Sequence, residues 1–397
     1  MKIGVIKEGK TPPDKRVPLT PKQCAFLKQK FSFEIVVQPS NIRCFSDQEY
    51  ADEGILLQND LSDCDLILGV KEVPIKNLIS NKTFVFFSHT IKKQPYNQNL
   101  LKKIIQQNIQ LIDYEVLKGE DGKRVLGFGR YAGIVGCYNA FLTYGLKTGS
   151  FNLKPAHLCF DKKEMESELK KVNINNLKII LTGSGRVSQG AKEILDLLNI
   201  QYVSKSDYLN SSFNDNVCVI LNAVDYYKRM DGKDALRSDL YKNPSLFESC
   251  LLDYLSSDTD ILITGHFYDS NAPYLLTRND FKVNNSRLQV VADISCDIDG
   301  PIGCTIKPST IADPIYGYNP ITEKEDDYKK DNVVAVMAVD NLPCELPRDA
   351  SDFFGNELIT TFFPNLINDE INMINGATIT KSGDLNDGFE YLKDYIS

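Results

Sequence analysis

Short apolar runs alternate along the chain with segments whose apolar residues recur at helical spacing. Such alternation is typical of parallel strands joined by crossover helices, and it predicts an α/β fold. A helix is expected to begin at Thr20-Pro21-Lys22-Gln23, which has the pattern of a capping box, and another covers 97–108. The predicted strands of this first part are 2–6, 33–37, 65–70, 83–87 and 110–114.

A second series of strand and helix patterns follows a glycine-punctuated stretch at 127–149. Within that stretch, residues 134–146 predict one long helix that links two domains. The continuous apolar run at 333–339 predicts a strand buried on both faces. Residues 351–366 have helical periodicity and are expected to return to the first domain. The predicted strands of this second part are 178–182, 201–203, 217–222, 261–264, 288–293 and 333–340.

These patterns predict two Rossmann-like, doubly wound domains with parallel sheets, separated by an active-site cleft. The length of 397 residues agrees, because it is about twice that of an ordinary domain. We expect a discontinuous substrate domain of residues 1–135 plus 346–397, and a dinucleotide-binding domain of residues 136–345.

Composition narrows the possible partners and compartments. Apolar residues make up 42% of the chain, and the net charge of −8 argues against a nucleic-acid partner, which needs concentrated Lys and Arg. The first ten residues lack the apolar core of a signal peptide, and no apolar stretch approaches the roughly 20 residues that span a bilayer. We therefore expect a cytoplasmic protein without a membrane partner.

The ten cysteines are scattered from Cys24 to Cys344 without a CxxC pair or a histidine at ligand spacing. They are interpreted as reduced thiols. No metal site is expected.

A phosphate-binding turn is predicted where the apolar strand 178–182 runs into a GxGxxxxG segment and a helix at 191–198. In such a turn Gly183 allows the sharp bend, and Gly185 lets the backbone approach a pyrophosphate at the helix N-terminus. The residues expected to contact the dinucleotide in this turn and at the end of strand 217–222 are Gly183, Ser184, Gly185, Arg186, Val187 and Asn222.

Cofactor choice depends on the residue about 20 positions beyond the first glycine, where NAD enzymes carry an acid for the ribose hydroxyls. This chain has Val203-Ser204-Lys205-Ser206 there. Ser204 and Lys205 favour the 2′-phosphate of NADP(H). Asp207 follows closely, so NAD(H) stays open.

Lys71 and His89 follow successive apolar strands, 65–70 and 83–87. Neighbouring strands of a parallel sheet end at the same edge, where α/β proteins bind ligands. A desolvated lysine has a lowered pKa and is able to accept a proton near neutral pH. Each residue alone has an ordinary interpretation as a solvated lysine or a core histidine, but the pair predicts an acid–base site.

Several charged residues accompany this pair. Arg16 and Arg124 are expected to reach the same region and bind carboxylates in bidentate fashion. Glu72 adjoins Lys71, and Glu115 ends the strand 110–114.

Motifs throughout the chain resemble one family. RVPLTP at 16–21 is similar to the N-terminal motif shared by alanine dehydrogenase, the transhydrogenase nucleotide-binding subunit and lysine-forming saccharopine dehydrogenase. QPSNIRCFSDQEY, LILGVKEVP, FFSHTIKKQ and KRVLGFGRYAGIVG resemble the lysine–2-oxoglutarate reductase half of the bifunctional lysine-degrading enzyme, and so do TGSGRVSQGA, VVADISCDIDGPI and DNLPCELPRDAS. The resemblance covers residues 2 to about 365.

The resemblance implies reductive joining of lysine and 2-oxoglutarate to saccharopine, or the reverse reaction, and at most the reductase activity of the bifunctional enzyme. It implies that Lys71 and His89 are the acid–base pair. The residues implied to bind the substrate or organise its site are Arg16, Lys92, Arg124, Glu72, Glu115 and Asp293, and those implied near the nicotinamide are Asp340 and Leu342.

Two alternatives remain open. An alanine dehydrogenase or another amino-acid dehydrogenase would share Arg16, Lys71 and His89, and a non-catalytic dinucleotide-binding subunit would hand hydride to a membrane partner. The direction of the reaction and the oligomeric state, a homo-oligomer included, also stay open.

Overall fold

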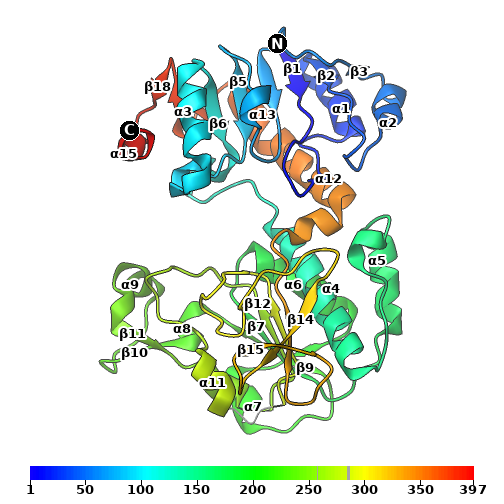
Figure 1. Ribbon diagram of the computed structural model, residues 1–397, viewed down its shortest axis with the longest axis vertical. Coiled ribbons are helices and arrows are strands. Elements are labelled where there is room, and N and C mark those ends of the chain that lie inside the picture. The colour runs from blue at the N-terminus through cyan, green and yellow to red at the C-terminus, as the bar shows by residue number, and fades with distance from the viewer. Residues whose placement is uncertain (257, 284–286) are drawn as a thin grey trace. The chain divides into compact units, whose positions relative to one another are not determined.

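The computed structural model describes residues 1–256, 258–283 and 287–397, which form two compact units (Figure 1). Unit 1 contains residues 1–128 and 347–397, and unit 2 contains residues 129–346. Within the described residues each unit has one eight-stranded sheet that is mostly parallel, so the predicted α/β class is confirmed. The boundary expected after residue 135 falls inside α4 (Gly129–Thr148), because this helix begins earlier than its pattern suggested.

The sheet of unit 1 has the order β18-β17-β6-β5-β4-β1-β2-β3. Its parallel strands lie where the apolar runs predicted them: β1 (Lys2–Val5), β2 (Glu34–Val37), β4 (Leu66–Leu68), β5 (Thr83–Phe86) and β6 (Gln110–Asp113), with the short β3 (Leu56–Leu57) at one edge. The antiparallel β17 (Thr378–Lys381) and β18 (Asp384–Leu385) close the other edge. They come from the C-terminal segment, for which the sequence predicted no element.

Helices cover both faces of this sheet. The capping box of α1 is present, since the Gln23 N–H donates to Thr20 Oγ1 and the Thr20 N–H donates to Gln23 Oε1. The Gln23 side chain also donates to the Asp352 carbonyl, which ties α1 to the returning α12. The helices of unit 1 are α1 (Pro21–Phe31), α2 (Asp47–Asp52), α3 (Gln98–Gln106), α12 (Pro347–Glu357), α13 (Phe363–Ile367), α14 (Met373–Gly376) and α15 (Lys393–Ile396), with a π-helical turn at Leu358–Phe362.

The sheet of unit 2 has the order β15-β14-β16-β13-β12-β7-β9-β8. The chain's second strand in this unit, β8, therefore lies at the edge, and β9 lies between it and β7. The parallel strands are β7 (Lys178–Thr182), β8 (Gln201–Tyr202), β9 (Val217–Leu221), β12 (Ile261–Thr264), β13 (Val290–Asp293) and β16 (Val334–Met337), and the antiparallel ones are β14 (Ile315–Asn319) and β15 (Lys324–Asp326). All residues of β16 are buried, as its continuous apolar run predicted.

After β9, residues 223–255 of unit 2 form an excursion from its eight-stranded sheet. It contains the antiparallel pair β10 (Tyr227–Arg229) and β11 (Phe247–Ser249), with α9 (Arg237–Lys242) between them. The other helices are α5 (Lys162–Glu168), α6 (Arg186–Leu197), α7 (Lys205–Asn210), α8 (Ala223–Tyr226), α10 (Leu251–Leu255) and α11 (Arg278–Val283).

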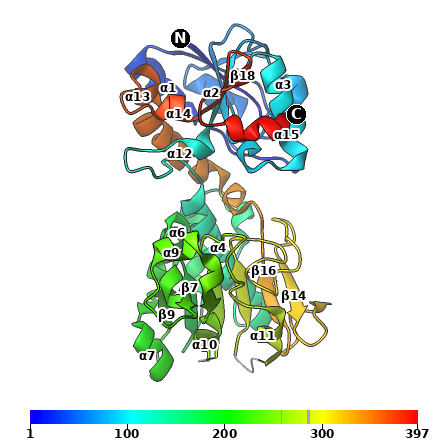
Figure 2. The ribbon, with the colours of Figure 1, turned by 90° about the vertical axis from the view of Figure 1, so that its left-hand side faces the viewer.

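Helices α4 and α6 lie side by side (Figure 2) because glycines permit a close backbone approach. A Cβ added to Gly133 would lie 1.8 Å from the Val187 carbonyl oxygen, and one added to Gly190 would lie 2.0 Å from the Arg130 carbonyl oxygen. Gly190 is the late third glycine of the predicted turn. In dinucleotide-binding turns the third glycine serves close packing of helix on strand, and here it serves close packing of helix on helix.

The ten cysteines, all in the described part of the chain, are free thiols, and seven of them are buried. Among the described residues, none of the helices combines the length and the apolar character that a membrane span requires.

Candidate active site

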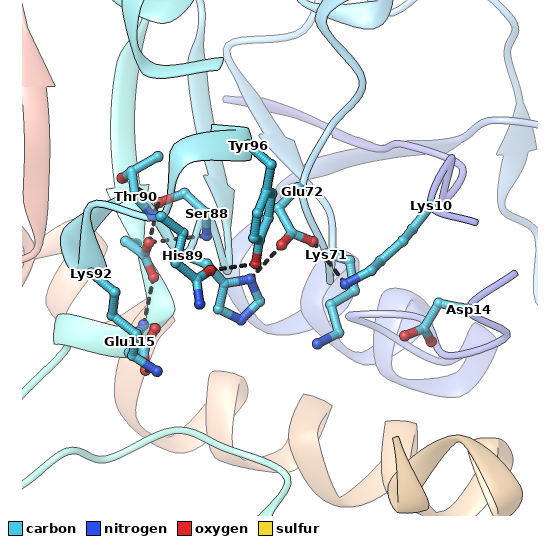
Figure 3. A network of polar contacts seen from close by, with 12 residues as sticks. Lys10, Asp14, Lys71, Glu72, Ser88, His89, Thr90, Lys92, Tyr96 and Glu115 are labelled. Atoms are coloured by element: carbon cyan, nitrogen blue, oxygen red, sulfur yellow. Dashed lines mark hydrogen bonds and ion pairs between the residues drawn. The ribbon is translucent and has the colours of Figure 1, made fainter. Parts of the chain in front are cut away.

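The strand ends of unit 1 bring Lys71 and His89 together. Strands β4 and β5 are parallel neighbours, and the Phe87 N–H donates to the Val70 carbonyl at 3.0 Å. Lys71 follows Val70 directly, and His89 lies two residues after Phe87. Figure 3 shows both side chains extending to the same side of the strand ends. The predicted juxtaposition is present, and the chemical roles stay a proposal.

His89 is oriented by a carboxylate. Its Nδ1 lies 2.6 Å from Glu72 Oε1, so the Nδ1–H donates to Glu72 and Nε2 is left for other chemistry (Figure 3). Burial works to raise the pKa of Glu72, but the hydrogen bond and charge of His89 outweigh it and hold the pKa at about 2. Glu72 is therefore a permanent anion that sets the imidazole's orientation and tautomer.

The backbone of His89 adopts a left-handed φ of 51°, an uncommon conformation for this residue type that persists only where the surroundings impose it. Asp113, fully buried at the end of β6, provides the neighbouring anchor. The Ser88 N–H donates to Asp113 Oδ2 at 3.0 Å, the Ser88 hydroxyl donates to the same oxygen, and the Glu115 N–H donates to Oδ1 at 2.7 Å. The sequence reasoning missed Asp113, although it ends a predicted strand.

Lys71 has the electrostatic surroundings of a proton acceptor. Burial lowers its pKa to about 8, with further lowering by the charges of Arg16 and Lys10. Its loop is anchored by Glu8, whose two carboxylate oxygens accept the N–H groups of Val70 at 2.7 Å and Lys71 at 2.9 Å. Burial also raises the pKa of Glu8 to about 8.

Glu8 and Lys10 escaped the sequence reasoning, which took only Arg16 from the loop after the first strand. β1 pairs with β4, so the loop after β1 lies next to Lys71. Lys10 Nζ lies 3.4 Å from Glu72 Oε2. Applying the strand-end rule to the first strand would have identified both residues.

The structure corrects the expectation for Arg16. Its side chain is 2% exposed, and its guanidinium forms a bidentate pair with Asp14 at 2.6 and 3.0 Å. The guanidinium carbon also lies 4.1 Å from the centre of the Phe128 ring. A substrate carboxylate would have to replace Asp14, so direct binding by Arg16 is not supported. Its charge acts instead on the pKa of Lys71.

Lys92 and Arg124 share one carboxylate. Lys92 Nζ lies 3.1 Å and Arg124 Nη1 lies 3.6 Å from Glu115 Oε1, and both cations are exposed. These two charges keep the pKa of Glu115 below its usual value although burial works to raise it. Both cations lie near His89 around Glu115, and ammonium and guanidinium groups suit a carboxylate ligand.

The glycine turn of unit 2 lines a pocket of ≈ 330 Å³. Gly183 has a φ of 88°, and a Cβ at this position would lie 2.5 Å from the Gly265 carbonyl oxygen. The turn opens onto the N-terminus of α6, whose N–H groups favour an anion. The predicted cofactor residues that line this pocket are Gly183, Ser184, Gly185, Arg186, Val187 and Asn222.

His266 lines the same pocket. Its Nδ1 lies 2.7 Å from Thr182 Oγ1, while its buried Nε2 has no hydrogen-bond partner among the described residues. Burial lowers the pKa of His266 to about 4, so the ring is neutral. The buried Nε2 of His266 lacks a partner among the described residues, and the turn at Gly183 has no room for a Cβ. Both features fit a nucleotide, whose hydroxyl and phosphate oxygens would contact them.

Ser204 and Lys205 are not among the described residues that line this pocket. The physical reason is the sheet order, because β9 separates β8 from β7. Ser204 instead caps α7 by accepting the Asp207 N–H, and Lys205 forms an ion pair with Asp225. The structure thus leaves these two residues outside the lining of this pocket, and their contact with the ribose stays a prediction.

Three further predicted residues have structural surroundings. Asp293 is fully buried, and its oxygens accept the hydroxyls of Thr264, Ser295 and Thr305, each at 2.6 Å. This saturated carboxylate ties the ends of β12 and β13 together, so direct substrate binding is not supported. Leu342 is buried near Gly136 of α4, and Asp340 is an exposed residue just beyond β16. Their predicted place near a nicotinamide stays untested.

Two groups of curated proteins resemble this chain. The chain is 30% identical over 430 residues to alpha-aminoadipic semialdehyde synthase, mitochondrial, of Mus musculus, across 96% of this chain and 46% of that protein. The Arabidopsis thaliana protein is 30% identical over 437 residues, across 98% and 41%. The chain thus spans about half the length of these relatives. The mitochondrial label of the mouse protein leaves the expected cytoplasmic location a prediction.

The NAD(+), L-lysine-forming saccharopine dehydrogenase of Neurospora crassa is 24% identical over 358 residues, across 87% of this chain and 86% of that protein. Two solved structures share the fold at 15% identity: an L-alanine dehydrogenase, with a TM-score of 0.67 and full coverage of both chains, and the transhydrogenase from Sinorhizobium meliloti, with a TM-score of 0.60 and coverage of 98% and 100%. The alanine dehydrogenase/PNT N-terminal domain model matches residues 4–135. The expected resemblance to saccharopine dehydrogenases, to alpha-aminoadipic semialdehyde synthase and, over residues 4–135, to the alanine dehydrogenase/PNT N-terminal domain is thereby confirmed.

Proposed function

We propose that this protein is an NAD(P)-dependent oxidoreductase that joins the ε-amine of lysine to the ketone of 2-oxoglutarate and reduces the imine to saccharopine, or catalyses the reverse. The observation that carries the proposal is the Lys71 and His89 pair at neighbouring strand ends, with a lowered lysine pKa and a histidine oriented by Glu72. The name of the L-lysine-forming saccharopine dehydrogenase of Neurospora crassa supports the choice of lysine and saccharopine.

The side chains of unit 1 suit the proton transfers that imine formation requires. Attack of the amine on the ketone releases a proton, and departure of the hydroxyl as water consumes one. Lys71, with a pKa of about 8, has an appreciable neutral fraction near pH 7 to 8 and accepts the proton from the amine. His89, when doubly protonated beside the Glu72 anion, delivers its Nε2 proton to the departing hydroxyl and keeps the Nδ1–H that Glu72 accepts.

Lys92 and Arg124 are the residues we assign to the carboxylates of the keto acid. Both side chains are exposed and contact Glu115, so a substrate carboxylate would reach them from solvent. Arg16 keeps a supporting role, because its positive charge lowers the pKa of Lys71.

The dinucleotide belongs to the pocket formed by the glycine turn and α6. When bound, the nicotinamide donates or accepts the hydride of the redox step. The backbone of Gly183 and Gly185 would approach the pyrophosphate, and Arg186 at the start of α6 would face it. We favour NADP(H) over NAD(H).

The test is oxidation of NADPH and of NADH by the purified protein with 2-oxoglutarate plus lysine, compared with pyruvate plus ammonia. The proposal expects lysine-dependent oxidation that Lys71→Met and His89→Gln abolish, and that the exposed control Lys76→Met retains. Activity only with pyruvate and ammonia would indicate an alanine dehydrogenase. No oxidation with either pair would reject both assignments.

A further inference from the structure

The order of strands in unit 2 changes which residues lie at the ribose position. In dinucleotide-binding sheets, the strand next to the glycine-turn strand ends beside the adenosine ribose, where an acid holds the hydroxyls of NAD or an arginine accommodates the phosphate of NADP. The neighbour of β7 on this side is β9. The residues after Leu221 therefore take the place that spacing alone assigned to Ser204 and Lys205.

The acid in this segment is already engaged. Asp225 Oδ2 accepts the Asn222 N–H at 2.8 Å, and Oδ1 forms an ion pair with Lys205. The Asp225 side chain is only 9% exposed. A carboxylate neutralised in this way is not available to ribose hydroxyls. This position therefore lacks the free acidic side chain that favours NAD(H).

An arginine from the excursion lines the pocket instead. Arg237, on α9, lines it together with Gly183 and Asn222, and its Nε donates to the Tyr241 hydroxyl at 3.1 Å. Over residues 1–256, 258–283 and 287–397, no carboxylate forms an ion pair with this guanidinium. Arginine is the side chain best suited to bidentate binding of phosphate, and a pocket arginine without an acidic partner favours an anionic ligand.

A second, independent feature of the pocket also indicates a ligand. His266 is 8% exposed, lines the pocket, and has a buried Nε2 that no described residue satisfies. A polar group buried without a partner is costly unless a ligand or water completes it. The pocket is therefore incomplete without a polar occupant.

We propose that Arg237 receives the 2′-phosphate of NADP(H) and is the residue that selects this dinucleotide over NAD(H). Tyr241, four residues further along α9, holds the guanidinium through its hydroxyl, and its ring lies 5.6 Å from the guanidinium carbon. Lys205 has no part in the selection, because its charge is neutralised by Asp225. The inference rests on the proposed use of a dinucleotide and is independent of which amine is the substrate.

The test compares binding of adenosine 2′,5′-bisphosphate with binding of 5′-AMP to the full chain by isothermal titration calorimetry. The two probes differ only in the 2′-phosphate. We expect the wild type to bind the bisphosphate more tightly by on the order of 10-fold or more, the gain of a charged hydrogen bond. Arg237→Gln should abolish that difference and leave 5′-AMP affinity unchanged, while the matched control Lys205→Gln should keep the difference.

Equal affinity of the wild type for both probes would overturn the proposal, and so would a preference that survives Arg237→Gln or disappears in Lys205→Gln. Equal weakening of both probes in Arg237→Gln would place the guanidinium on the common part of the nucleotide and would also overturn it. Failure of the proposed function is distinguishable. Lysine-dependent oxidation of NADH alone would keep the function and reject the role of Arg237, whereas nucleotide binding without lysine-dependent oxidation would reject only the function.

Discussion

The carboxyl ends of the parallel strands differ sharply between the two units. In unit 1, strands β4, β5 and β6 end in ionisable side chains that pair with one another, such as His89 with Glu72. In unit 2, strands β7 and β12 end in Gly183 and Gly265, whose backbones lie so close that a Cβ on Gly183 would lie 2.5 Å from the Gly265 oxygen. The strand ends at the glycine turn of unit 2 thus present bare backbone, whereas those of β4, β5 and β6 in unit 1 are followed by charged side chains.

The difference teaches how one sheet type serves two tasks. A site for proton transfer depends on charges that shift one another's pKa values, as Arg16 and Lys10 do for Lys71. A site for a dinucleotide depends on shape, because backbone N–H groups have to reach the phosphates. Substitutions in unit 1 should therefore alter rates and pH dependence, and substitutions in the turn of unit 2 should alter binding and stability.

The largest effect is expected for Lys71→Met and His89→Gln. Removing either proton-transfer group should lower kcat by about 100- to 10,000-fold. Steady-state kinetics with lysine and 2-oxoglutarate measures this, and calorimetric titration with NADPH serves as the control. Unchanged affinity for NADPH is expected, because proton transfer is assigned to unit 1 and dinucleotide binding to unit 2. Loss of NADPH binding in the Lys71 variant would contradict this division.

A smaller effect, on stability, should follow from Gly183→Ala. The substitution places a Cβ against the Gly265 oxygen at a φ of 88°, and should cost about 1–3 kcal/mol of unfolding free energy. Gly185→Ala is the matched control, since nothing lies within 4 Å of its added Cβ and its φ is −82°. Urea denaturation measures both variants. Equal stability of the two variants would contradict the claim that the close backbone approach at Gly183 excludes a Cβ.

The pH dependence should shift in Lys10→Met. Lys71 must be deprotonated to accept a proton, so kcat/KM rises with pH through the lysine's pKa of about 8. The positive charge of Lys10 lowers the pKa of Lys71. Removing that charge should therefore shift the rising part of the kcat/KM profile to higher pH and slow the reaction at pH 7. The exposed Lys7→Met is the control. A kcat/KM profile that stays in place or shifts to lower pH would refute the claim that the charge of Lys10 lowers the pKa of Lys71.

The smallest effect is a gain in stability in Lys71→Met. The folded-state pKa of Lys71, about 8, lies below the ordinary value of 10.5, so the unfolded chain binds more protons between these values. The charged lysine therefore destabilises the fold below pH 8, and this cost disappears as pH rises through the window. The variant should have the larger unfolding free energy at pH 7, and the gap should narrow by pH 10.5. A difference in unfolding free energy that widens between pH 7 and pH 10.5 would contradict a lowered pKa of Lys71 in the folded state.

Local patterns predicted much of the fold, because apolar runs and glycine or proline breaks mark strands and caps wherever they occur. They also placed Lys71, His89, Glu72 and the glycine turn, since each lies directly at the end of such a run. The sequence did not reveal that β9 lies between β7 and β8, because strand pairing is a long-range choice that neither strand's own pattern contains. That order leaves Lys205 outside the lining of the glycine-turn pocket.

The pairing of Arg16 with Asp14 was missed for a similar reason. The two residues lie close in sequence, but the burial of both side chains and the position of Arg16 over the Phe128 ring depend on the packing of unit 1. Asp293 was misjudged because three hydroxyls from separate segments surround it. Burial and partner saturation emerge from tertiary contacts, and residue type at a strand end does not report them.

The most direct test of the central claim is detection by mass spectrometry of a product that joins lysine and 2-oxoglutarate, formed with NADPH or NADH by the wild type, Lys71→Met and His89→Gln. The account predicts saccharopine from the wild type and at least about 100-fold less from either variant. Saccharopine formed equally well by the variants, or no lysine-containing product from the wild type, would contradict the assignment of this chemistry to the strand ends of unit 1.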